Sequence, residues 1–132
     1  MNKIPGKITE VNVEGNISLL TIRSGEVFFK AIVLEVPETS DYLKVGNPIH
    51  ILFKETEVII GKGDVSQISL RNKINCEVVS IDNGKLLSKL TLHSDLGEIR
   101  SVITSNAVSQ LQIREGDKVV AMIKTNEIIL SE

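Results

Sequence analysis

Hydrophobic and polar residues alternate along short stretches of the chain, a pattern that predicts β-strands rather than amphipathic helices. In the first half, turn sequences interrupt the alternation at Glu14-Gly15-Asn16 and at Ser24-Gly25. The strands predicted for this half span residues 4–13, 17–23, 27–36, 49–54 and 56–60. Those predicted for the second half span residues 75–82, 86–92, 98–104, 118–124 and 127–130.

Each half also contains one short helical signal. In residues 37–43, Pro37 stands at an early position and Thr39 and Ser40 can cap the first turn, before Gly46 ends the segment. In the second half, Ser105 can cap a helix over residues 106–111. Five short strands with one short helix, in about 65 residues, are typical of a small Greek-key barrel of the OB type.

The chain repeats itself when it is shifted by 70 residues. The shift aligns Asn2-Lys3-Ile4 with Asn72-Lys73-Ile74, Ser18 with Ser88, Leu20-Thr21 with Leu90-Thr91, Gly46 with Gly116, Lys54 with Lys124, Glu57 with Glu127, and Ile59 with Ile129. We therefore predict an all-β protein of two tandem OB-like five-stranded barrels. The first unit is residues 1–61, the linker 62–66 and the second unit 67–132. Because neither unit is large, we expect them to pack together and the chain to form homo-oligomers.

Composition and charge argue against nucleic-acid binding. Of the 132 residues, 42% are hydrophobic, which is enough for a core, but only 3% are aromatic and none is Trp. The net charge is −2 and the pI is near 5.7. A nucleic-acid binder of the OB type relies on clustered basic residues and aromatic platforms, which this chain lacks. The single cysteine, Cys76, stands in a strand-like alternation and is interpreted as a small buried hydrophobe.

The sequence also lacks the patterns of common catalytic and metal sites. It contains no P-loop, no Ser-His-Asp set, no dinucleotide fingerprint and no paired carboxylates suited to acid–base catalysis. His50 and His93 have no Cys or carboxylate at ligand spacing, which argues against zinc. There is no N-terminal signal pattern and no apolar run of about 18 residues. We therefore expect a cytoplasmic protein that is not an enzyme and does not bind membranes.

One stretch in the middle of the chain combines groups that suit an anion. It is Gln67-Ile68-Ser69-Leu70-Arg71-Asn72-Lys73-Ile74, which follows a Gly-containing connector. On a strand, Ser69 and Arg71 would point to the same side. The hydroxyl donates one hydrogen bond, and the guanidinium supplies a permanent positive charge with several donors. Because an isolated Ser-x-Arg is common, its place in the repeat is what makes it a candidate anion site.

Four segments of the second half share a further pattern: Ser69-Leu70-Arg71-Asn72-Lys73, Val102-Ile103-Thr104, Leu111 to Gly116-Asp117-Lys118-Val119, and Ile123-Lys124-Thr125. In these segments the second half resembles a molbindin domain, also called Mop or TOBE. The whole chain resembles the tandem di-Mop molbindins, more strongly over residues 67–132 than over 1–61. The resemblance implies an OB-like fold, assembly into oligomers, and binding of molybdate or tungstate at interfaces between units, with no covalent chemistry.

The resemblance also implies which residues bind the oxyanion. The family's Ser-x-Arg-Asn pattern falls at the start of the second unit, a hydroxyl follows its third strand, and a Lys followed by a small residue comes late. Ala107 stands where the family often has another hydroxyl, which is a departure from the family's pattern. The expected ligand-binding residues are Ser69, Leu70, Arg71, Asn72, Thr104, Ala107, Lys124 and Thr125.

The first unit is expected to carry a degenerate site. Its Ser-x-Arg would lie before Met1, and Lys54, a weak helper at most, is followed by the carboxylate of Glu55, which repels a dianion. Because Ser69 and Arg71 are expected at a different edge of a unit from Thr104 and Lys124, we expect complete sites to form between copies, in a dimer or trimer of the two-unit chain.

Two roles fit an oxyanion-binding chain of this kind. The first is molybdate or tungstate storage or homeostasis by a standalone protein. The second is a ligand-sensing module of a molybdate-responsive regulator or transporter ATPase, and genomic context would discriminate between the two. An OB-type nucleic-acid binder is a third class, which the acidic balance disfavours.

Overall fold

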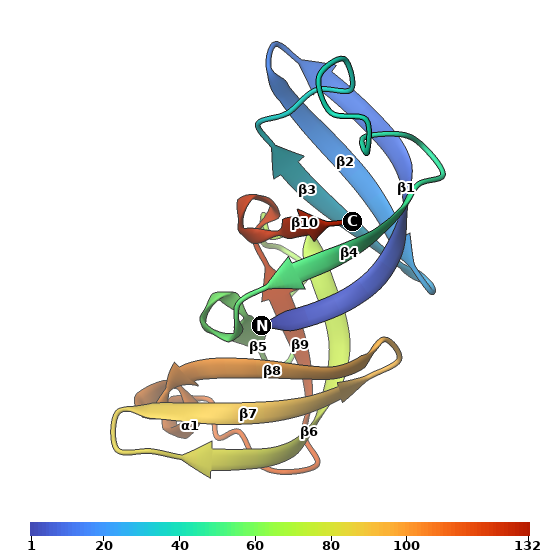
Figure 1. Ribbon diagram of the computed structural model, residues 1–132. Coiled ribbons are helices and arrows are strands. Elements are labelled where there is room, and N and C mark those ends of the chain that lie inside the picture. Colours follow the sequence, from blue (N-terminus) through green and yellow to red (C-terminus); the bar gives the residue numbers. More distant parts are fainter.

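Ten β-strands form two five-stranded antiparallel sheets in the computed structural model, which describes all 132 residues (Figure 1). The strands are β1 (Asn2–Glu14), β2 (Ile17–Ser24), β3 (Val27–Val33), β4 (Pro48–Phe53), β5 (Ile59–Gly61), β6 (Asn72–Asn83), β7 (Leu87–Ser94), β8 (Gly97–Thr104), β9 (Lys118–Ile123) and β10 (Ile129–Ser131). The other elements are α1 (Ser105–Gln110) and two 3-10 turns, η1 (Glu55–Glu57) and η2 (Thr125–Glu127). The nearly all-β, OB-like fold predicted from the alternation is confirmed.

The long first strand of each half curls its sheet. β1 pairs with β2 along one part of its length and with β4 along the other, and β6 pairs with β7 and β9 in the same way. Each strand has a bulge at the corresponding point, after Ile8 in β1 and after Val78 in β6. A bulge bends a strand and increases its twist. The two halves therefore pair their strands in the same way, as the repeat in the sequence predicts.

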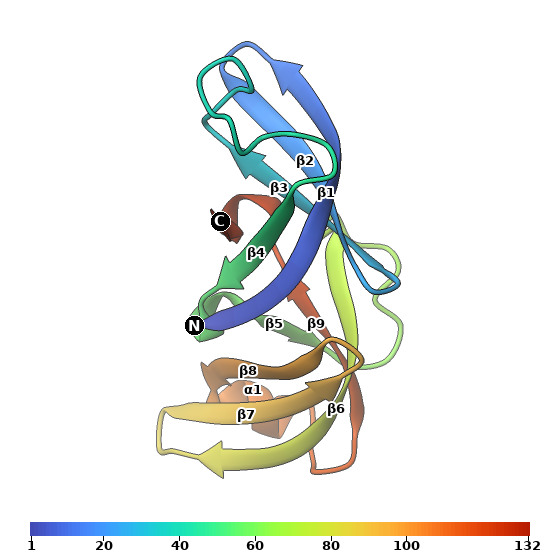
Figure 2. The same cartoon turned by 45° about the vertical axis from the view of Figure 1, so that its right-hand side comes forward.

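The fifth strand of each half completes the sheet of the other half. β5 pairs with β9 (Figure 2), and β10 pairs with β4 (Figure 1). The barrels therefore do not coincide with the consecutive units 1–61 and 67–132, because each contains a strand from the other half. Alternation shows which face of a strand is buried, but it does not show which strand is its neighbour.

Only one of the two predicted helices forms. In the second half, α1 begins at Ser105 and its cap is Thr104, whose side chain accepts a hydrogen bond from the N–H of Ala107 at 3.1 Å. In the first half, the predicted helix over residues 37–43 is wrong, since this segment consists of turns. Leu34 takes the place of Thr104 and has no hydroxyl, while Pro37 takes the place of Ala107 and has no N–H.

The predicted cap of the second helix is corrected as well. The hydroxyl of Ser105 does not cap α1, because it donates to the carbonyl of Gly84 at 2.7 Å and lies 2.8 Å from the hydroxyl of Ser88. These bonds join the start of α1 to the β6–β7 turn. At six residues, α1 is the longest helix of the structure and falls well short of a membrane span.

A single hydrophobic cluster runs through both halves. It contains 24 buried residues, including Phe29 and Phe53 from the first half and Leu90 and Ile99 from the second. Cys76 belongs to this cluster, and its thiol donates to the carbonyl of Ile74. The interpretation of Cys76 as a buried hydrophobe is confirmed. Because the strand exchange joins the sheets, the two barrels share one core.

Removal of β10 should loosen the first sheet rather than the second. In a chain shortened by residues 129–132, β4 loses the partner that pairs with Leu52, Ile51 and His50. We expect amide hydrogen exchange of β4 to accelerate by at least about tenfold, while exchange in β9 changes much less. Equal acceleration in β4 and β9, measured by mass spectrometry or NMR, would contradict the exchanged pairing.

Cys76 should be inert toward thiol reagents in the folded protein. Burial raises the pKa of this thiol to about 11. At pH 8 a group with that pKa is about 0.1% thiolate, whereas an ordinary cysteine thiol is about one quarter thiolate. We expect labelling by an aromatic disulfide reagent to be at least about 100-fold slower in native protein than in guanidinium chloride. Rapid labelling of the native protein would show that Cys76 is accessible.

Candidate functional site

The Ser69–Arg71 segment is a loop, so the strand geometry considered for Ser69 and Arg71 does not apply. Residues 62–71 have no regular structure, and β6 starts only at Asn72. The loop is held from inside: the Arg71 guanidinium donates to the carbonyls of Ser69 and Ile68. A further bond ties the loop to β6: the Lys73 ammonium donates to the carbonyl of Val65 at 2.8 Å.

Five of the expected site residues line one hollow of about 380 Å³. The hollow is lined by Ile59, Ile68, Ser69, Leu70, Arg71, Lys124 and Thr125. The pairing of β6 with β9 explains how distant residues meet here. Asn72 and Ile123 form the last residue pair between β6 and β9. Arg71 precedes Asn72 and Lys124 follows Ile123, so both lie just beyond this end of the paired strands. The expectation that Lys124 lies at a different edge from Arg71 is therefore wrong.

The charges in this hollow all have one sign. Its lining includes Arg71 and Lys124 but no carboxylate, and the hydroxyls of Ser69 and Thr125 add two hydrogen-bond donors. Arg71 and Lys124 are both exposed, so their charges are available to a ligand from solvent. The apolar side chains of Ile59, Ile68 and Leu70 form the rest of the wall. Two cations and two hydroxyls beside an apolar wall suit a small anion of charge −2.

Thr104 and Ala107 lie outside this hollow. They line a second one, of about 470 Å³, whose walls are mostly hydrophobic and include Leu87, Ile103 and Leu111. Ile59 lines both hollows, so the two adjoin at this side chain. Within one chain, the structure does not bring Thr104 and Ala107 together with Ser69 and Arg71.

Asn72 is buried with its side chain turned away from the hollow, toward the first half. Its side-chain oxygen accepts from the N–H of Lys30 at 2.7 Å, and its side-chain NH₂ donates to the carbonyl of Lys30 at 2.9 Å. Both polar atoms of this amide are therefore used within the protein. The sequence pattern identified the residue but not this partner.

Lys54 occupies the position in the first half that corresponds to Lys124. It is exposed, and it lines none of the hollows. The next residue, Glu55, forms an ion pair with the ammonium group of Met1. The hydrogen bond from this ammonium lowers the pKa of Glu55 and keeps the carboxylate charged. This negative charge beside Lys54 makes the first-half position less suited to an anion than the second.

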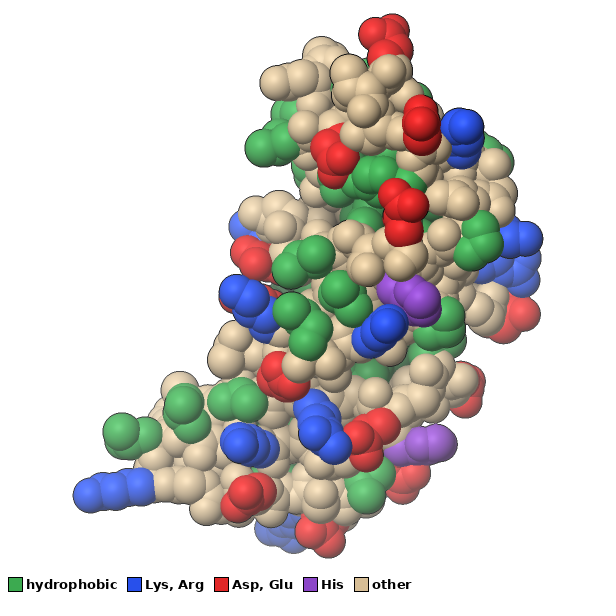
Figure 3. All heavy atoms as spheres, in the orientation of Figure 1, with side chains coloured by type: hydrophobic (Ala, Val, Ile, Leu, Met, Phe, Trp, Pro, Cys, Tyr) green, Lys and Arg blue, Asp and Glu red, His purple; other side chains and the backbone are tan.

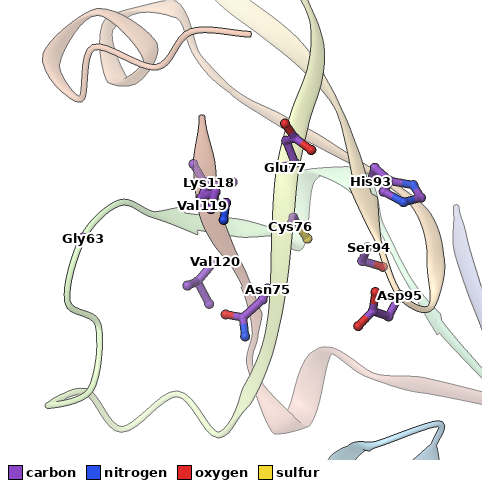
Figure 4. Close-up of a pocket in the computed structure, with 10 residues that line it drawn as sticks. All are labelled: Gly63, Asn75, Cys76, Glu77, His93, Ser94, Asp95, Lys118, Val119 and Val120. Carbon is purple, nitrogen blue, oxygen red and sulfur yellow. The ribbon is translucent and has the colours of Figure 1, made fainter. Parts of the chain in front are cut away.

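A larger hollow of about 570 Å³ lies on the other part of the second sheet, around Cys76 (Figure 4). Its lining combines Glu77 and Asp95 with Lys118 and His93. Figure 4 shows these side chains spread over β6, β7 and β9 without converging on one point. No group of three metal-binding side chains occurs anywhere in the chain. The mixed charges give this hollow no preference for an anion.

Sequence reasoning missed Ile59 and Ile68 as walls of the hollow. Ile59 is 45% exposed although it lies on a strand of apolar residues, which was the available signal of a surface role. Its place beside Arg71 depends on the strand exchange, because β5 comes from the first half. No local pattern in the sequence reveals that exchange.

Comparisons with known proteins find one matching domain family and several similar proteins. Residues 68–130 match the TOBE domain. The molybdenum transport protein ModE of Azotobacter vinelandii is 24% identical over 132 residues, which cover 98% of this chain and 49% of ModE. The chain thus spans about half the length of this curated relative.

Two solved structures extend the comparison. The cytoplasmic molybdate-binding protein ModG, in a crystal form with molybdate bound, is 25% identical, with a TM-score of 0.90 over 98% of this chain and 94% of ModG. A molybdate-binding protein from Sporomusa ovata is 32% identical, with a TM-score of 0.49, and matches 50% of this chain and 98% of its own. With a TOBE domain in its second half and the fold of ModG along nearly its whole length, the chain belongs to the molbindin family, as two Mop units in tandem.

Proposed function

We propose that this molbindin binds molybdate or tungstate in the hollow of Ser69, Arg71, Lys124 and Thr125. The observation that carries the proposal is the composition of that hollow, which holds two cations and two hydroxyls and no carboxylate. The likeness to ModG, which was crystallised with molybdate bound, supports the choice of ligand. Binding rather than catalysis is proposed, because the named relatives are binding and transport proteins.

The chemistry of the ligand matches these groups. Molybdate and tungstate are tetrahedral dianions whose four oxygens accept hydrogen bonds and donate none. Arg71 and Lys124 balance a charge of −2, and hydrogen bonds from charged donors are about twice as strong as neutral ones. The hydroxyls of Ser69 and Thr125 orient the oxygens. Selection against sulfate, which has the same charge and shape, depends on the size of the closed site.

A second copy of the chain is proposed to close the site. Thr104 and Ala107 line the adjoining apolar hollow rather than that of Ser69 and Arg71, and we infer that another copy brings them to the oxyanion. That hollow continues into exposed apolar side chains, of which Leu86 is 77% and Leu87 56% exposed. Figure 3 shows hydrophobic side chains gathered over the ends of β7 and β8 and again near β4 and β10. Such surface supports a homo-oligomer, a dimer or trimer of the two-unit chain.

Two biological roles are compatible with this site. Storage or homeostasis of the oxyanion is the first, and the likeness to ModG, a cytoplasmic molybdate-binding protein, supports it. Sensing within a larger regulator or transporter is the second, and the match to half of ModE supports it. A conformational change on binding, transmitted to a separate partner protein, would favour sensing.

Substitution of either cation in the hollow should weaken oxyanion binding. We expect Arg71→Ala and Lys124→Ala each to raise the Kd for molybdate by at least about tenfold, because each removes a charged donor from a dianion. Calorimetry with molybdate, repeated in excess sulfate, measures the effect. Arg114→Ala is the matched control, because Arg114 is exposed and lines none of the hollows, and it should leave the Kd unchanged. Equal affinity in wild type and Arg71→Ala would refute the proposed site.

A charge in the apolar hollow should break the oligomer. Leu87→Glu places a carboxylate among Ile103, Leu111 and Ile59, and we expect native mass spectrometry to show dissociation toward single chains. Val79→Glu is the control, since Val79 is a strand residue of similar exposure, 53% against 56%, and lies outside the hollow. If both variants keep the wild-type mass, this surface is not the contact between copies.

A further inference from the structure

Asn72 forms a clamp between the two sheets. It stands at the start of β6, is fully buried, and uses its side-chain amide to bond both the N–H and the carbonyl of Lys30. Lys30 belongs to β3, which is the edge strand of the first sheet. The side chain thus makes the pair of bonds that a neighbouring strand would otherwise supply to this edge.

The repeat contains a second clamp of the same kind. Asn2 bonds the carbonyl and the N–H of Arg100, at 2.9 and 2.8 Å, and Arg100 lies on β8, the edge strand of the second sheet. The two clamps are related by the shift of 70 residues, since Asn2 corresponds to Asn72 and Lys30 to Arg100. They contribute comparable bonds to the fold, but only Asn72 adjoins the hollow of Ser69 and Arg71.

The neighbourhood of Asn72 suggests what it adds to the site. The connection from Gly63 to Leu70 has no regular structure, and the Arg71 guanidinium bonds only to carbonyls of this same loop. The loop therefore stabilises its own shape. Its start is anchored by the Lys62 ammonium, which donates to the carbonyls of Leu111 and Gln112 and to the Asp117 carboxylate, so the end that carries Ser69 and Arg71 depends on the anchor at the start of β6. Asn72 is the adjacent residue that is both buried and bonded across the molecule.

We propose that Asn72 is a positioning residue, which orders Ser69 and Arg71 at the hollow by clamping the start of β6 to β3 of the other sheet, while the pairing of β6 with β9 sets the place of Lys124. Its side chain does not reach the oxyanion, because it is fully buried and bonded to Lys30 through both its oxygen and its nitrogen. The order of the site in the second half thus depends on a strand of the first half. This role rests on the proposed function only in that the positioned loop is taken to be the oxyanion site.

The test compares Asn72→Ala with Asn2→Ala in the full chain. Both variants lose two hydrogen bonds at equivalent places, so we expect their Tm values to fall by similar amounts. In ligand-free protein, we expect the NMR order parameters of the Ser69 and Arg71 amides to fall from about 0.85 to under about 0.6 in Asn72→Ala only. In calorimetry, we expect molybdate binding to weaken at least about tenfold more in Asn72→Ala than in Asn2→Ala.

Unchanged order at Ser69 and Arg71 in Asn72→Ala, or an equal loss in both variants, would overturn the positioning role. If the wild-type protein binds no molybdate, the proposed function fails, and the order parameters still decide the role of Asn72 because they need no ligand. If Asn72→Ala does not fold, Asn72→Asp and Asn2→Asp give the same comparison. Each keeps the acceptor of the clamp and loses the donor.

Discussion

The exchange of β5 and β10 is the constraint on which the other features of this protein depend. A three-residue strand contributes little to stability alone, but here each one completes the sheet of the opposite half. The two Asn clamps reinforce the same arrangement at the edge strands β3 and β8. The halves consequently share one hydrophobic core, and each sheet includes a strand supplied by the other half.

The hollow proposed for the oxyanion lies beside one of these exchanges, that of β5. Arg71 and Lys124 come together because β6 and β9 pair beside them, and Ile59 reaches them because β5 has crossed from the first half. The first half thus contributes to a site whose charged groups all belong to the second. In the first half, Glu55 stands at the position equivalent to Thr125. The second half therefore supplies the cations of the hollow, and the first half supplies only the apolar wall residue Ile59.

Much of this arrangement could be predicted from the sequence. Period-2 alternation and the 70-residue repeat predicted the strands and the OB-like fold, because they reflect which faces are buried. The resemblance to molbindins pointed to Ser69, Arg71, Lys124 and Thr125, which the structure brings together. The failures concern information that is not local. The partner of β5, the partner of Asn72 and the meeting of Arg71 with Lys124 are set by pairing between distant segments. The first-half helix failed because Leu34 and Pro37 remove its cap, a detail that general helix signals do not weigh.

We propose that a tetrahedral dianion sits between Arg71 and Lys124, beside the exchanged strand β5. Crystals of the protein grown with tungstate test it most directly, because tungsten scatters anomalously and its position can be located without reference to the protein. We expect an anomalous tungsten peak close enough to the Ser69 hydroxyl and the Arg71 guanidinium for the tungstate oxygens to accept hydrogen bonds from both. A peak confined to another hollow, or no peak in protein saturated with tungstate, would contradict it.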